Sequence, residues 1–259
     1  MQISVVIPTY NRANLIVRTI NSILNQTVRV DEIIVIDDGS TDNTKELLSA
    51  LPITYIYQEN NGVSSARNNG IKKSQYSWIA FCDSDDIWHP NKIEEQIKFH
   101  KQYQDILISH TNEIWKFNEK IIKQKRYQSK PSGYCFIDIL DSCKIGASTL
   151  IIHKSILDDI GLFDENLVAC EDYDLWLRIL LKYKLGLCQE ALITKIAGHR
   201  GQLSFETPLM DTFRIKALQK HLNCEFKDEV KRELTKKIDI LIKGAIKHNN
   251  IELLNKYLN

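Results

Sequence analysis

The chain has 259 residues, of which 43% are hydrophobic and 26% are charged, a composition typical of a globular protein with a substantial core. Its formal net charge of +1 argues against a nucleic-acid-binding protein and against a strongly acidic one. No segment approaches 18 consecutive apolar residues, and no basic segment with a cleavage site precedes the first strand, so the sequence predicts neither a membrane span nor a secretion signal.

Strands and helices alternate in the first hundred residues. Four apolar runs, most of them rich in β-branched residues, predict strands buried on both faces, and three segments between them have helical spacing. The strands are expected at 3–7, 32–36, 53–57 and 78–82, and the helices at 15–24, 41–51 and 64–74. Thr41 or Asp42 is a candidate N-cap of the second helix. Because strands that alternate with helices form right-handed β-α-β units, we expect an α/β protein with a mostly parallel sheet.

The second half of the chain is less regular. Alternating residues in 105–134 predict strands on a side sheet, and 146–153 predicts a further strand with a helix from Ser155. Residues 172–184 form an amphipathic helical pattern. From Glu225 onward the pattern is helical with a break near residues 249–250, which predicts a terminal helical hairpin.

We therefore expect a main domain at 1–210, with halves at 1–104 and 105–210, and a C-terminal helical hairpin at 211–259. The hairpin carries 11 Lys and Arg against 7 Asp and Glu, a net charge of +4, which leaves −3 for the first 210 residues. A solvated helix face is the favoured reading of this basic segment, and contact with anionic lipid head groups is the alternative. The six cysteines include no CxxC pair, so we expect reduced thiols in a cytoplasmic protein.

Polar clusters stand directly after three of the predicted strands. They are PTYNR at 8–12, DDGS at 37–40 and DSDD at 83–86. In open α/β sheets, ligands bind outside the carboxyl ends of the strands. The three clusters are therefore expected to meet at one edge of the sheet.

The DSDD cluster places Asp83, Asp85 and Asp86 within four positions. Carboxylates this close repel one another and lose solvation in a closed site, so a positive partner is expected. A solvated turn is the ordinary reading of an isolated DxD. Here the preceding strand is apolar and two other polar clusters face it, and Mg²⁺ or Mn²⁺ takes one or two carboxylates together with substrate phosphates. The sequence therefore predicts a divalent metal.

The other two clusters offer the groups that a nucleotide needs. PTYNR supplies a hydroxyl, an aromatic face and a guanidinium, and DDGS supplies carboxylates and a glycine turn. Arg67, at the start of a predicted helix beside the same edge, is either an anion-binding residue or a surface arginine. The chain has no G-x-G-x-x-G, no P-loop and no G-x-S-x-G motif, which argues against dinucleotide, P-loop and serine-hydrolase chemistry.

The order of these motifs resembles glycosyltransferase family 2. IPTYNR, VIDDGSTD, NGVSSARNNG and DSDD carry the resemblance through about the first 100 residues, and it continues more thinly at 170–178 (CEDYDLWLR) and 197–204 (AGHRGQLS). The last 50 residues match no family pattern. The resemblance implies a GT-A fold, which is a Rossmann-like, mostly parallel sheet flanked by helices, here with a C-terminal helical extension. It also implies inverting transfer of a sugar from a nucleotide donor, usually a UDP-sugar, to a hydroxyl.

The resemblance implies roles for the residues that match these motifs. Residues 1–104 would be the nucleotide-binding half and 105–210 the acceptor-binding half. Asp38 would accept the uracil N–H, Asp83 would hold the ribose, and Asp85 would bind the Mn²⁺ or Mg²⁺ ion. The complete nucleotide-binding set is Pro8, Thr9, Tyr10, Arg12, Asp38, Arg67, Asp83 and Ser84. Asp86 receives no role.

The EDYD segment has two readings. Acidic residues suit the first turn of a helix, where Asp174 can pair with Arg178 at i+4. The resemblance implies instead that Asp172 is the catalytic base and that Glu171 helps to place acceptor or donor. The later HRGQLS segment implies that His199 is a second metal ligand and that Arg200 reaches the diphosphate.

The sequence therefore predicts a metal-dependent hexosyltransferase. Neither a Q-x-x-R-W signature nor membrane helices are present, so we expect one sugar to be added per encounter, to a glycan or lipid-linked acceptor in bacterial surface polysaccharide or glycoconjugate assembly. A sugar nucleotidyltransferase and a catalytically inactive GT-A-derived binding domain are the alternatives. Retention of Asp38, Asp85, Asp172 and His199 argues against the inactive domain. The donor sugar, the linkage and the oligomeric state stay open.

No basic, aromatic-interleaved stretch points to a nucleic-acid partner. Because lipid-linked acceptors lie at a membrane, the basic hairpin could hold the enzyme at the inner face of the membrane. The candidate contact residues are Lys231, Arg232, Lys236, Lys237 and Lys243.

Overall fold

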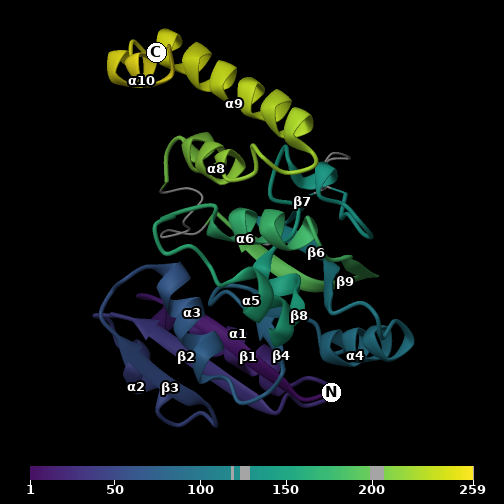
Figure 1. Ribbon diagram of the computed structural model, residues 1–259. Coiled ribbons are helices and arrows are strands. Elements are labelled where there is room, and N and C mark those ends of the chain that lie inside the picture. The colour runs from purple at the N-terminus through teal and green to yellow at the C-terminus, as the bar shows by residue number, and fades with distance from the viewer. Residues whose placement is uncertain (118–119, 123–128, 199–206, 259) are drawn as a thin grey trace.

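A computed structural model describes residues 1–117, 120–122, 129–198 and 207–258 (Figure 1). In this part of the chain, nine strands form one sheet in the order β3-β2-β1-β4-β8-β6-β9-β5, with β7 paired to β6. The strands are β1 Ile3–Thr9, β2 Glu32–Asp38, β3 Thr54–Gln58, β4 Trp78–Phe81, β5 Ile87–Trp88, β6 Ile108–Phe117, β7 Lys120–Ile122, β8 Ile151–His153 and β9 Gly186–Ala197. The α-helices are α1 Ala13–Leu24, α2 Thr44–Leu48, α3 Val63–Lys73, α4 Lys92–Gln102, α5 Lys154–Ile160, α6 Glu171–Leu180, α8 Met210–Gln219, α9 Lys227–Lys247 and α10 Ile251–Leu258. Two short 3₁₀ helices are η2 Ile137–Ile139 and η3 Ala147–Thr149.

The first half of the sheet is parallel and the second half is mixed. β3, β2, β1 and β4 run parallel, β8 is antiparallel to β4 and β6, and β9 runs parallel to β6. Parallel ladders contain most of the paired residues, and helices cover both faces. The predicted α/β architecture is confirmed.

Successive residues of the central strands face opposite sides of the sheet, as the pleat requires. Val5 and Ile7 pack in one buried cluster with residues of α1 and α4, whereas Val6 packs in the other with residues of α3, α5 and α6. Because both faces are apolar, the parallel strands read as continuous hydrophobic runs. The same burial directs the polar residues to the strand ends.

Two predictions for the second half are wrong. The strands described within residues 105–134 are β6 and β7, and they do not form a side sheet, because β6 lies inside the single sheet between β8 and β9 and β7 pairs with β6. Residues 146–153 are not one strand, because the carbonyl oxygen of Gly146 accepts hydrogen bonds from Thr149 N (3.0 Å) and Thr149 Oγ1 (2.6 Å). These bonds close a turn that becomes η3, and β8 begins only at Ile151.

The predicted C-terminal hairpin is present as α9 and α10, with Asn249 between them at φ 51°. Figure 1 shows both helices at the end of the molecule opposite the parallel strands, with α8 between them and α6. Helix α8 was not predicted, and its Ala217 and Leu218 belong to the core that α6 shares. No helix in the described part of the chain is long and apolar enough to span a membrane. The boundary at residue 210 stays a prediction.

Substitution of Gly70 in α3 tests the packing between α3 and the sheet, with Gly244 in α9 as the control position. A Cβ built on Gly70 of α3 would lie 2.3 Å from Val6 Cγ1 of β1, whereas a Cβ on Gly244 of α9 would meet nothing within 4 Å. We expect Gly70→Ala to lower the free energy of unfolding by about 1–3 kcal/mol through overpacking. Gly244→Ala, the control, should raise it by about 0.5–1 kcal/mol through helix propensity. Urea unfolding measures both, and equal effects would contradict the packing argument.

Candidate functional site

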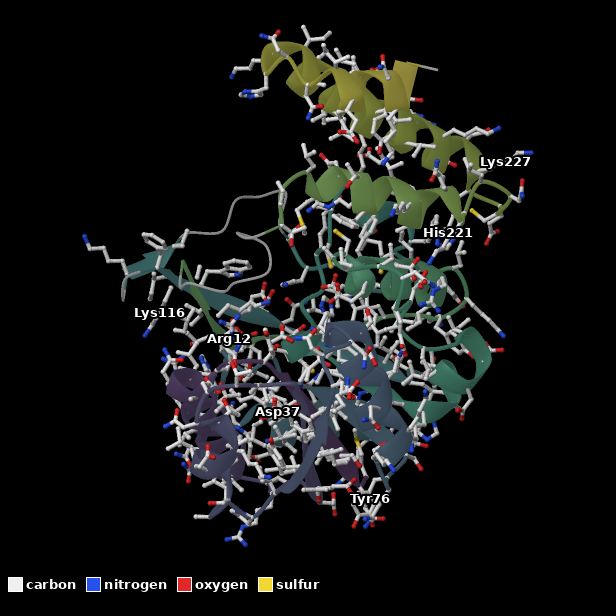
Figure 2. The ribbon with its side chains drawn as sticks, turned by 90° about the vertical axis from the view of Figure 1, so that its left-hand side faces the viewer. Arg12, Asp37, Tyr76, Lys116, His221 and Lys227 are labelled. Atoms are coloured by element: carbon white, nitrogen blue, oxygen red, sulfur yellow. The ribbon has the colours of Figure 1, made fainter. Side chains whose placement is uncertain are left out.

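The three polar clusters meet at the carboxyl edge of the parallel strands. Thr9 at the end of β1 pairs in register with Asp37 of β2, and Cys82 N after β4 donates to Val6 O of β1 at 3.1 Å. Figure 2 shows Arg12 and Asp37 toward this edge, whereas Tyr76, which precedes β4, lies at the far end. The expected convergence is confirmed.

The turn after β1 is tied to the turn after β2. Asn11 has a positive φ of 51°, its backbone N donates to Ser40 Oγ (2.8 Å), and its Oδ1 accepts from Thr41 N (2.8 Å). Arg12, partly buried, occupies the N-cap position of α1. These bonds fix the backbone from which the residues of the first cluster project.

The predicted nucleotide-binding residues of the first cluster differ in accessibility. Pro8 and Thr9 are buried in β1, where Pro8 pairs in register with Ile36 of β2. Tyr10 is 47% exposed at the edge of the sheet. Of these three, Tyr10 offers an open aromatic face on which a base can stack.

Asp38 is buried and accepts three hydrogen bonds from the protein. Its Oδ1 accepts from Gln58 Nε2 (2.7 Å) and Asn61 N (3.0 Å), and its Oδ2 accepts from Gly62 N (2.8 Å). A carboxylate has about four acceptor positions, so one position remains for a ligand donor such as an imide N–H. Asp38 thus also anchors the loop that leads into α3, where Gly62 has φ +90°.

Arg67 of α3 joins two carboxylates that are far apart in sequence. Its Nη2 lies 2.8 Å from Asp83 Oδ1, its Nη1 lies 2.6 Å from Glu171 Oε1, and its guanidinium lies 5.2 Å from the Phe163 ring centroid. Only 4% of Arg67 is exposed. Burial raises the pKa of Glu171, and Arg67 opposes that rise. The bridge holds the loop after β4 against the first turn of α6.

Asp172 points to a different neighbour from Glu171. It is partly exposed, and its Oδ2 accepts from Cys143 Sγ at 3.4 Å. Burial raises the pKa of Cys143, and Asp172 raises it further, so Cys143 is a neutral thiol that can donate. The sequence did not predict Cys143 as a neighbour of the candidate base.

The helix-start reading of EDYD is confirmed for its fourth residue. Asp174 is fully buried, with Arg178 Nε 3.0 Å from its Oδ2 and Lys220 Nζ 2.7 Å from its Oδ1. Asp174 therefore links α6 to α8 and is available to no ligand. The catalytic reading concerns Asp172 and Glu171 and stays a prediction.

The DSDD loop is held by neighbouring elements rather than left as a solvated turn. Asp83 N donates to Ser148 Oγ of η3 (2.9 Å), and Thr19 Oγ1 of α1 donates to the carbonyl oxygens of Ser84 (3.0 Å) and Asp86 (2.9 Å). Asp83 and Asp85 are partly exposed, whereas Ser84 and Asp86 are buried. The two carboxylates that reach the surface are the two assigned to ribose and metal.

Lys195 of β9 supplies a positive charge that the sequence did not reveal. Its Nζ lies 3.8 Å from Asp86 Oδ2. Asp86 is separated from Lys195 by over a hundred positions, and β9 reaches the loop only because it pairs with β5. The one local signal was that Lys195 closely precedes the AGHRGQLS segment.

The carboxylate of Asp85, which is partly exposed, is of the kind that a hard divalent cation prefers, and its chemistry fits Mn²⁺ or Mg²⁺. Among the described residues, no group of three or more His, Cys, Asp or Glu is arranged to hold a metal. His199 and Arg200 lie outside the described residues.

Comparisons with known proteins agree with this geometry. The family model described as Glycosyl transferase family 2 matches residues 4–159. A glycosyltransferase of Rickettsia felis is 37% identical over 215 residues, which are 80% of this chain and 35% of that protein. The Escherichia coli UDP-Glc:alpha-D-GlcNAc-diphosphoundecaprenol beta-1,3-glucosyltransferase WfaP is 33% identical over 206 residues, which are 78% of this chain and 79% of that enzyme. Residues 1–349 of S. aureus TarS in complex with UDP-GlcNAc superpose with a TM-score of 0.72 at 19% identity, covering 94% of this chain and 73% of that chain.

The chain spans 35% of the length of the Rickettsia felis relative. The likeness to TarS shows the GT-A fold. The family match covers more than half of the chain, and the motifs on which it depends lie together at the carboxyl edge of the sheet. This protein belongs to glycosyltransferase family 2.

Proposed function

We propose that this protein is an inverting, non-processive glycosyltransferase that moves a sugar from a UDP-sugar to a hydroxyl of a glycan or lipid-linked acceptor in bacterial surface polysaccharide or glycoconjugate assembly. The observation that carries the proposal is the Arg67 bridge, which brings the loop with Asp83 and Asp85 to the helix start with Glu171 and Asp172. The names of two similar proteins support it, since WfaP uses UDP-Glc and a diphosphoundecaprenol-linked sugar, and TarS was solved with UDP-GlcNAc.

The donor would bind at the carboxyl edge of β1, β2 and β4. The exposed ring of Tyr10 would stack on the base, and the remaining acceptor position of Asp38 would take the uracil N–H. Asp83 would hold the ribose with the part of its carboxylate that Arg67 leaves accessible. Arg67 itself, held by two carboxylates, would orient this loop.

Asp172 would act as the general base. The acceptor hydroxyl gives its proton to a carboxylate oxygen of Asp172 while the hydroxyl oxygen bonds to the anomeric carbon. The bond from that carbon to the diphosphate oxygen breaks, and its electron pair leaves with UDP. Cys143 would hold Asp172 in the orientation that receives the proton.

Mn²⁺ or Mg²⁺ would be held by Asp85 and His199 and would neutralise charge on the departing diphosphate. Arg200 would add a further positive charge beside it. These two assignments after β9 stay predictions from the resemblance.

We also propose that the C-terminal hairpin contacts an anionic membrane surface. Exposed isoleucines stand beside basic residues on α9 and α10, with Ile240, Ile246 and Ile251 exposed to 57%, 60% and 69%. Apolar side chains next to lysines favour the membrane interface. The exposed basic residues of the two helices are Lys227, Lys231, Arg232, Lys236, Lys243, Lys247 and Lys256. Lys237 is not among them, contrary to the prediction, because it is buried and its Nζ donates to Asp141 O at 2.8 Å.

Isothermal titration of UDP with and without Mn²⁺ tests the donor site. We expect wild type to bind UDP in a metal-dependent way and Asp85→Ala to lose that dependence, because it loses a carboxylate that fits the metal. Asp158→Ala, which removes an exposed aspartate of α5, is the matched control and should bind as wild type does. A folded wild-type protein that binds no uridine nucleotide would contradict the proposal and favour the inactive binding domain.

Asp172→Asn tests the base. We expect kcat to fall by about 10²- to 10⁴-fold, because the amide cannot accept the acceptor's proton. UDP affinity should stay near the wild-type value, since Asp172 contacts the acceptor rather than the nucleotide. Sugar transfer and UDP titration are measured on the same preparation, with Asp158→Asn as the control. Unchanged kcat in Asp172→Asn would remove Asp172 from the role of base.

Co-sedimentation with vesicles tests the membrane contact. We expect wild type to bind vesicles that contain phosphatidylglycerol more tightly than neutral ones, and the double variant Lys243→Glu/Lys247→Glu to lose the difference. Lys72→Glu/Lys73→Glu makes the same change of charge on the exposed side of α3 and should behave as wild type does. Equal binding of wild type to both kinds of vesicle would refute the contact.

A further inference from the structure

Lys195 is surrounded by carboxylates of the candidate donor site. Its side chain is 21% exposed, and the side chain of Asp86, 3.8 Å away, is 3% exposed. Burial lowers the pKa of Lys195, but Asp86, Glu113, Asp83 and Asp85 together raise it above its ordinary value. An ammonium ion therefore stands inside the acidic cluster.

Gly146 lets this ammonium approach Glu113. A Cβ built on Gly146 would lie 3.1 Å from Glu113 Oε2 and 3.2 Å from Lys195 Nζ. The backbone of Gly146 has φ −77° and ψ 135°, which any residue adopts. What glycine provides here is therefore room for the neighbouring side chains and not an unusual backbone conformation. Both charged groups pack against the same point of the backbone just before η3.

Charges of opposite sign alternate from the DSDD loop across β9 and β6. In space, Lys195 lies next to Asp86, and Glu113 is the next charged group after Lys195. Oε1 of Glu113 accepts from Lys130 Nζ at 2.7 Å. Trp115 Nε1 also donates to Glu113 Oε1 (2.9 Å), and Trp115 pairs in register with Lys195. Glu113 is thus fixed by its own partners and can hold Lys195 in place.

Lys195 and a side-chain hydrogen bond with Ser148 both stabilise the carboxylate of Asp86. The backbone of Asp86 is anchored, since its N donates to Asp83 O at 3.1 Å and its carbonyl oxygen accepts from Thr19. Its buried Oδ2, in contrast, has no hydrogen-bond partner among the described residues. A buried carboxylate without a countercharge is costly, so loss of Lys195 would displace Asp86 and the loop that it closes.

We propose that Lys195 is a positioning residue of the donor site: by compensating Asp86 it holds residues 83–86 in the arrangement in which Asp83 and Asp85 bind the ribose and diphosphate side of the donor. This inference rests on the proposed function. It assigns Lys195 an effect on donor affinity through Asp86, and no contact with the acceptor.

Isothermal titration of UDP into three variants tests the proposal. Lys195→Met removes the charge and should raise the Kd for UDP by about tenfold or more, because small displacements of binding groups have large effects. Lys195→Arg keeps the charge and should stay within about threefold of wild type. Lys195→Gln also removes the charge, with a polar side chain in its place, and should raise the Kd in the same direction. Lys98→Met, which removes an exposed lysine of α4 paired with Glu94 and Glu95, is the control and should not change the Kd.

The stoichiometry of the titration separates positioning from a merely structural role. A structural role would lower the number of binding sites per chain and leave the Kd of the folded molecules unchanged, which would overturn the proposal. Where Lys195→Met does not fold, Lys195→Gln with an unchanged Kd would overturn it equally. Wild type that binds no UDP would overturn the proposed function as well, whereas wild-type binding with an unaltered Kd in Lys195→Met would overturn this inference alone.

Discussion

The arrangement of the site depends on the buried bridge from Arg67 to Asp83 and Glu171. These partners lie 16 and 104 positions from Arg67, so one side chain connects the loop after β4 with the start of α6. Removal of one partner from a buried ion pair costs about 3–5 kcal/mol, because it leaves an uncompensated charge. Asp172 follows Glu171 directly, so the bridge also sets the position of the candidate base relative to the donor loop.

The negative charge of the acidic loop after β4 is compensated by basic side chains of the protein. The loop is also suited to a metal cation. The sequence correctly indicated that so many carboxylates need a positive partner, and it pointed to a metal. The structure adds Arg67 at 2.8 Å from Asp83 and Lys195 at 3.8 Å from Asp86. Asp83 and Asp85 are the two carboxylates of the loop that remain partly exposed.

The parallel half of the fold was predictable and the mixed half was not. β1 and β2 are buried on both faces, so their apolar residues form continuous runs that mark each strand and its end. β6 carries an alternating pattern that fits a side sheet as well as a place between β8 and β9. The turn at Gly146 and the helix α8 were missed because hydrogen bonds and long-range packing, rather than periodicity, determine them.

The sequence by itself located the polar clusters at the ends of the buried strands, because polar groups that follow buried strands have few other places to lie. Asp38, Asp83 and Asp85 belong to these clusters, the resemblance added Asp172, and the structure brings the segments together. Only the tertiary structure decided which cation serves which carboxylate, that Cys143 contacts Asp172 and that Lys237 is buried. Burial and pairing depend on contacts between residues far apart in the chain, and no local pattern of residue types records them.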